Sequence, residues 1–131
     1  MKAKTGHKSV RFWLLTGSAG AVLSLFLGIF VLDALLGMRV TVRNTGSTTL
    51  RSVVLHVTGR EYLLGDVAPG ASAGATVKPT SESHLEIGFI DEAGISKRLD
   101  AGGYFEPGYR GTIQVSIKHG EIVENLQHID W

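Results

Sequence analysis

Two patterns of hydrophobic residues divide the chain. The run from Phe12 to Leu32 carries no charged residue, and a helix of this length, at about 1.5 Å per residue, spans close to the roughly 30 Å hydrocarbon core of a bilayer. From Arg39 onward, apolar and polar residues alternate, as is typical of strands with one buried face. We therefore expect one transmembrane helix over residues 12–36 and a β-domain after it.

The alternative to a membrane anchor is a cleaved signal peptide. The apolar core of a signal peptide is usually about 7–15 residues long and ends in a small-x-small cleavage site, whereas here Leu32 stands where a small residue is needed before Ala34. Basic residues without any acid precede the apolar run, and they are Lys2, Lys4, Lys8 and Arg11. Such a flank favours the cytoplasmic side, and Trp13 suits the headgroup level.

The predicted topology is therefore a single-pass protein of the inner (cytoplasmic) membrane. Residues 1–11 form a basic cytoplasmic N-terminus, and the C-terminal domain is periplasmic or otherwise extracytoplasmic. Almost no linker separates residue 36 from the first predicted strand at Arg39, so we expect the domain to lie close to the bilayer.

Small residues follow one face of the predicted helix in two adjacent rows spaced by four. They are Thr16, Gly17, Gly20, Ala21, Ser24 and Gly28. In lipid, such a stripe lets another helix approach closely, because packing and polar contacts drive association there. Gly is also simply frequent in membrane helices. The contact interpretation predicts that this face docks on another transmembrane helix, from its own copy or from a partner.

Beyond residue 38, alternation and regularly recurring turn signals predict an all-β domain with one hydrophobic core. The expected strands cover residues 39–43, 50–58, 61–64, 71–78, 84–90, 95–101 and 111–118, with an irregular corner at 65–70 and the 71–78 strand at an edge. Residues 39–120 would thus form a two-sheet sandwich. Residues 121–131 fit either a last strand or a short amphipathic helix.

A family resemblance rests on the first half of this domain. The residues that carry it are Val40-Thr-Val-Arg-Asn-Thr-Gly46, then Leu50, Val53 and Leu55, then Leu64-Gly65 and Pro69-Gly70. This segment, roughly 39–78, resembles the opening half of bacterial extracytoplasmic immunoglobulin-like modules, in which an N-x-G turn follows the first strand and a P-G corner precedes the next. The resemblance implies a mainly β, small two-sheet Ig-like sandwich, without the Cys–Trp–Cys hallmark of true immunoglobulin domains. Small anchored proteins of this kind resemble accessory or assembly factors of membrane complexes.

Composition narrows the chemistry. The chain has no cysteine, which excludes disulfides, thiolate metal sites and cysteine nucleophiles. Residues 39–131 carry slightly more acids than bases. The sequence therefore shows no clustered basic surface and predicts no nucleic-acid partner.

Candidate catalytic and metal-binding residues are few. His84 and Glu86 share one side of a strand, and His56 faces outward on another, so a metal site is conceivable, but the spacing matches no established motif. Asp66 and the pair Asp91-Glu92 occupy turns, where acids are ordinary. We therefore predict no enzymatic activity, no catalytic residues, no cofactor and no metal site.

The segment Gly102–Gly111 concentrates aromatic and basic residues around a predicted type II turn. Its partner-binding candidates are Tyr104, Phe105, Tyr109 and Arg110, because Tyr and Arg are favoured at interfaces. The alternative is that one or two of these rings cap the core. The predicted function is a non-enzymatic, protein-interaction or assembly subunit of a membrane complex. The alternative is an anchored module that binds a cell-wall saccharide or a metal.

Overall fold

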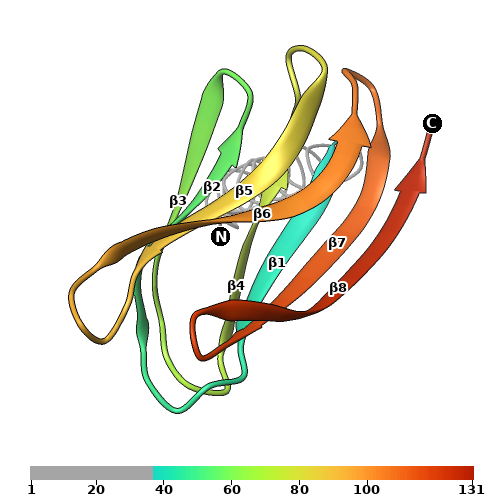
Figure 1. Cartoon of the computed structure of the whole chain (residues 1–131). Coiled ribbons are helices and arrows are strands. Elements are labelled where there is room, and N and C mark those ends of the chain that lie inside the picture. The colour runs from blue at the N-terminus through green and yellow to red at the C-terminus, as the bar shows by residue number, and fades with distance from the viewer. Residues whose placement is uncertain (1–36) are drawn as a thin grey trace, which may run out of the picture. The chain divides into compact units, whose positions relative to one another are not determined.

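The computed structural model describes residues 37–131, which lie in one compact unit (Figure 1). It contains eight strands in two four-stranded sheets. They are β1 (Met38–Asn44), β2 (Leu50–Val57), β3 (Arg60–Val67), β4 (Ser72–Val77), β5 (Ser83–Ile90), β6 (Ser96–Phe105), β7 (Arg110–Lys118) and β8 (Glu121–Asp130). The expectation of a mainly β, two-sheet domain is confirmed.

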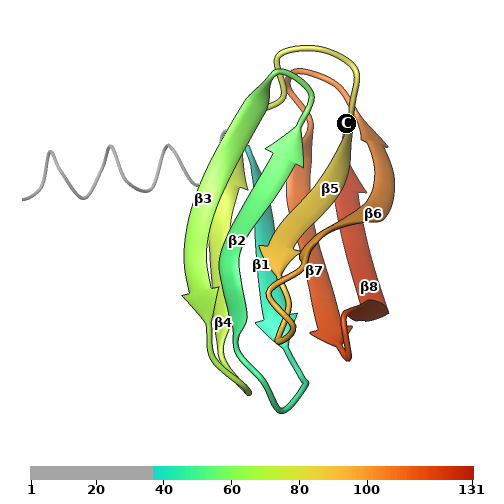
Figure 2. The same cartoon turned by 60° about the vertical axis from the view of Figure 1, so that its left-hand side comes forward.

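The two sheets have the strand orders β4-β1-β7-β8 and β3-β2-β5-β6, and they face each other as two layers (Figure 2). Neighbouring strands pair antiparallel except β1 and β7, which run parallel with Met38 beside Gly111. The parallel pair brings the first strand of the domain beside its second-last strand. β4, as predicted, lies at a sheet edge.

The core lies between the sheets and is built from alternate residues of the strands, since successive side chains of a strand point to opposite faces. The alternation of apolar and polar residues in the sequence accounts for most of it: Val40, Val42, Val53, Leu55, Val57, Val67, Leu85, Ile87, Phe89, Ile113, Val115 and Ile117 are all buried. Each such side chain contributes about 1.5–3 kcal/mol on leaving water. Met38, Val77 and Phe105 complete the layer.

Two predicted loops are in fact strand. The corner expected at 65–70 begins only after Val67, because Gly65, at φ 77°, lets β3 bulge and continue pairing with β2. Likewise β6 runs on through Gly102 and Gly103, both at positive φ, until Phe105 pairs with Ser83. Glycine tolerates this left-handed conformation, so the strand kinks without ending.

The C-terminal residues, for which strand and helix were both open, form the strand β8, which pairs with β7 along its length. The His119-Gly120 dipeptide closes this hairpin with positive φ at both positions, as a type I′ turn requires. The sandwich therefore extends to Asp130, ten residues beyond the predicted boundary at 120.

The sandwich has two ends that differ in composition. At one end a row of paired residues, Val77, Met38, Gly111 and Ile129, crosses the first sheet. We call it the proximal end, because β1 begins there. It also carries the loops at 78–82 and 106–109, the turn at 58–59 and the C-terminus (Figure 2). The distal end carries the loops at 45–49, 68–71 and 91–95 and the turn at 119–120.

Within residues 37–131 no helix has the length and apolar character needed to cross a membrane. The predicted anchor at 12–36, its basic flank at 1–11 and the small-residue stripe from Thr16 to Gly28 lie outside the described residues.

Candidate functional site

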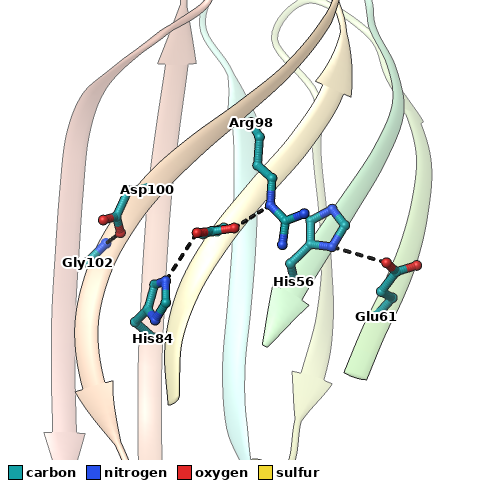
Figure 3. Close-up of polar contacts among 7 residues, drawn as sticks. His56, Glu61, His84, Arg98, Asp100 and Gly102 are labelled. Atoms are coloured by element: carbon teal, nitrogen blue, oxygen red, sulfur yellow. Dashed lines mark hydrogen bonds and ion pairs between the residues drawn. The ribbon is translucent and has the colours of Figure 1, made fainter. Parts of the chain in front are cut away.

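A network of charged side chains occupies the solvent-facing side of the β3-β2-β5-β6 sheet (Figure 3). Glu86 lies at its centre on β5. One carboxylate oxygen is 3.1 Å from His84 Nε2, and the other accepts a hydrogen bond from Arg98 Nε on the adjacent strand β6. His84 and Glu86 meet because residues two apart on a strand share a face. The sequence could not show Arg98 as a partner, since strand register decides that contact.

The two partners act on the ionisation of Glu86. The hydrogen bond from His84, followed by that from Arg98, lowers the Glu86 pKa below its usual 4.5, because both stabilise the charged carboxylate. Its cross-strand neighbour Asp100 turns away and accepts a hydrogen bond of 2.7 Å from the Gly102 N–H. This arrangement separates two like charges that would otherwise face each other.

His56 extends the network onto β2. It pairs directly with Glu86 across the sheet, and its Nδ1 is 3.3 Å from Glu61 Oε1. Gly88 makes room for the imidazole, because a Cβ at this position would lie 2.8 Å from His56 Nε2. These side chains line a shallow hollow of about 460 Å³. The hollow is lined by polar and apolar surface alike, and the ion pairs of His56 and Glu86 lie along its wall.

The geometry of the hollow is poorly suited to a cation. Among residues 37–131 no three ligating side chains converge as a metal ion requires. Glu86 already faces the Arg98 guanidinium, whose charge repels a cation. His56 and His84 each pair with a different carboxylate. The arrangement is a solvated ion-pair network.

The candidate partner-binding residues of the 102–111 segment separate into two groups. Phe105 is fully buried in the core, so its assignment as a partner-binding residue is wrong: its predicted loop is the end of β6, whose alternation turns this ring inward. Tyr109 is half-buried and packs on the edge of the core. Tyr104 and Arg110 remain exposed.

Tyr104 is held by a local contact. Its hydroxyl donates a hydrogen bond of 2.6 Å to Glu106, and this bond to the neutral phenol, with a smaller contribution from Glu82, raises the Tyr104 pKa. The aromatic surface also has a member that the sequence did not suggest. Trp131 is 91% exposed, and its ring centroid lies 6.4 Å from that of Tyr109.

β8 is a long strand with one unpaired edge. Its inward side chains Asn125 and Gln127 donate hydrogen bonds of 2.6 and 3.3 Å to the carbonyl of Ala101 in β6. These contacts join the edges of the two sheets. Leu126 between them points outward and is 56% exposed. The sequence did not reveal this edge, because strand and helix were both open for 121–131.

Comparisons with known proteins add little. No protein-family model matches the chain, and no curated protein matches it in sequence. Among solved structures, the NMR structure of a protein from Eubacterium rectale is similar at 6% sequence identity and a TM-score of 0.49, over 70% of this chain and 88% of that one. A similarity at this level carries no inference about function.

Proposed function

We propose that this protein is a membrane-anchored, non-enzymatic interaction subunit. Its extracytoplasmic Ig-like sandwich recruits a segment of a partner protein to the free edge of β8. The anchor, the orientation and the single pass come from the apolar run and basic flank of residues 1–36. The observation that supports the interaction is that β8 is a long edge strand whose outer side is unpaired within residues 37–131.

The edge of β8 is the least protected of the four sheet edges. Natural edge strands are usually shielded by Lys, Pro, bulges or short length. β4 has only six residues, β3 has an irregular register beside Gly65, and β6 contains Lys97, Arg98 and two glycines at positive φ. β8 has ten residues without Lys or Pro. From Glu124 to Asp130 its pairing with β7 is regular.

An extended peptide added to such an edge gains main-chain hydrogen bonds, while side chains on alternate positions give specificity. On β8 the outward positions offer Leu126 as an apolar contact between Glu124 and His128. This pattern favours a partner strand with an apolar residue flanked by polar ones.

The Ig-like part of the proposal draws support from the motifs at the distal end. Asn44, at the start of the N-x-G turn, exchanges main-chain hydrogen bonds with the P-G corner: its carbonyl accepts from Gly70 N–H at 2.7 Å, and its N–H donates to Ala71 at 3.0 Å. The two sequence motifs of the resemblance are therefore parts of one hydrogen-bonded corner.

The test uses the full chain extracted in mild detergent, with its companions identified by mass. Leu126→Lys places a charge on the β8 edge and should release the partner. Leu63→Lys is the matched control, since Leu63 is 80% exposed on β3, an edge strand of the opposite sheet. Equal loss, or no loss, in both variants would count against recruitment at β8.

A further inference from the structure

The Tyr and Trp side chains of residues 37–131 gather at the proximal end. They are Tyr62, Tyr104, Tyr109 and Trp131. Tyr62 accepts a hydrogen bond from Lys78 N–H directly after β4, Tyr104 ends β6, and Tyr109 and Trp131 flank the Gly111–Ile129 pair. The distal loops 45–49, 68–71 and 91–95 and the turn 119–120 contain none. Core packing alone does not explain this asymmetry, because Tyr104 and Trp131 are 54% and 91% exposed.

The described chain begins at the same end, and its first residue is already packed against the sandwich. Gly37 is buried, and a Cβ there would lie 2.7 Å from Thr76 Cγ2 and 2.8 Å from the Val77 carbonyl oxygen. Gly37, the first described residue, is thus already packed against β4. The predicted anchor ends at residue 36, so the sequence places no linker between it and the sandwich.

We propose that the proximal end of the sandwich rests on the headgroup layer of the bilayer that holds the anchor, with Trp131, Tyr109 and Tyr104 at the lipid–water interface. The proposal rests on the anchor of the proposed function and adds a lipid-contact surface to the domain itself. Tyr and Trp are enriched at this level, because their rings are amphipathic. Arg60 and Arg110 begin β3 and β7 at the same end and are exposed, and guanidinium groups suit lipid phosphates.

The charge at this end defines the kind of lipid. Arg60 and Arg110 are accompanied by Glu82, Glu106 and Asp130, so the surface is mixed and not strongly basic. Binding should therefore depend on the aromatic rings and persist on zwitterionic phosphatidylcholine. It should change little with salt, in contrast to polybasic surfaces that require anionic lipid. A lipid contact at the proximal end also leaves the β8 edge open to a partner, because that edge runs from the proximal to the distal end.

The experiment places the full chain in phosphatidylcholine vesicles and uses tryptophan as a depth reporter. Trp13→Phe leaves Trp131 as the single tryptophan. We expect Trp131 emission to shift to shorter wavelength on reconstitution and to be quenched more by a spin label at the headgroup than by one at the bilayer centre. Tyr104→Trp, in a chain that also carries Trp13→Phe and Trp131→Phe, should behave alike.

The matched control is Glu92→Trp in the same tryptophan-free chain, because Glu92 is exposed in the distal β5–β6 turn. Its emission should not respond to either label. If the chain floats with the vesicles but Trp131 is quenched no more than the Glu92→Trp reporter, the lipid contact is wrong while the anchor stands. If the chain does not float with the vesicles, both the anchor and the lipid contact fail.

Discussion

The side-chain amide of Asn44, at the end of β1, donates a hydrogen bond of 2.9 Å to the carbonyl of Val67, at the end of β3 in the opposite sheet. The same amide donates to Thr48, and its oxygen accepts from the Gly46 N–H. Asn44 is 1% exposed, so this one polar side chain holds the N-x-G turn and joins the two sheets at the distal end.

Asn44→Ala should destabilise the fold by about 1–3 kcal/mol, because the buried carbonyl of Val67 loses its donor. Chemical unfolding of the full chain measures the effect. Ser47→Ala, an exposed change in the same loop, is the control and should stay within about 0.5 kcal/mol of the parent. Equal effects of the two changes would show that the amide does not hold the corner.

Replacement of Phe105 tests whether the 102–111 segment is core or binding surface. Phe105→Ala should cost about 3–5 kcal/mol in unfolding experiments, because it empties a fully buried site. Tyr104→Ala and Arg110→Ala, both at exposed positions, should leave stability within about 0.5 kcal/mol. Loss of a partner in these two variants, with the fold intact, would restore a binding role to this segment.

The ion pairs of Glu86 predict an acid-dependent loss of stability. The Glu86 pKa is lowered in the folded protein, first by His84 and then by Arg98, so its charged form stabilises the fold above the usual carboxyl value of 4.5. This stabilisation is lost as the pH falls through the folded pKa, below 4.5.

Thermal unfolding between neutral pH and about pH 3 measures this loss, a range that covers the carboxyl titration. Glu86→Gln should flatten the decline in melting temperature, because the amide does not titrate. Glu92→Gln, in the β5–β6 turn, should keep the parent profile. A parent-like decline in Glu86→Gln would assign the acid sensitivity to other groups.

Zinc titration tests the metal alternative for the hollow. Zn²⁺ at micromolar concentration and neutral pH should not raise the melting temperature, because Arg98 is paired with the carboxylate that a metal would need. A rise that Glu86→Gln and His84→Ala both abolish would establish a metal site instead. His128→Ala, which changes a histidine of β8 outside the hollow, is the control. A rise in melting temperature that is equal in His128→Ala and in the parent would show that zinc does not bind through β8.

The small-residue stripe predicts helix contacts in the membrane. Gly20→Leu together with Gly28→Leu should abolish crosslinking through this face, because two large side chains keep a neighbouring helix from close approach. Val22→Leu and Phe26→Leu, which leave the stripe intact, are the controls. Crosslinking that persists unchanged in the Gly20→Leu, Gly28→Leu chain would show that the small residues are not a contact face and reflect only the usual composition of membrane helices.

The local pattern of the sequence predicts the buried positions correctly where the strands are regular. The inward positions of β1, β2, β5 and β7, such as Val40, Leu55 and Val115, follow from the two-residue period of a strand, which any one-sided burial imposes. The His119-Gly120 turn is local in the same sense, because its two positive φ angles meet the requirement of a type I′ hairpin. These features depend on neighbours in the chain, so the residues alone specify them.

Other features depend on contacts between distant segments. Phe105 is core because bulges at Gly102 and Gly103 carry β6 past its predicted end, and pairing with β5 maintains it. Arg98 reaches Glu86 because of the β5–β6 register. β8 is a strand because it pairs with the edge of β7. An isolated segment with the same apolar spacing is equally compatible with a helix. Register, sheet order and edge exposure arise from long-range pairing, and so the Glu86–Arg98 contact, the burial of Phe105 and the β8 edge are decided only in the folded domain.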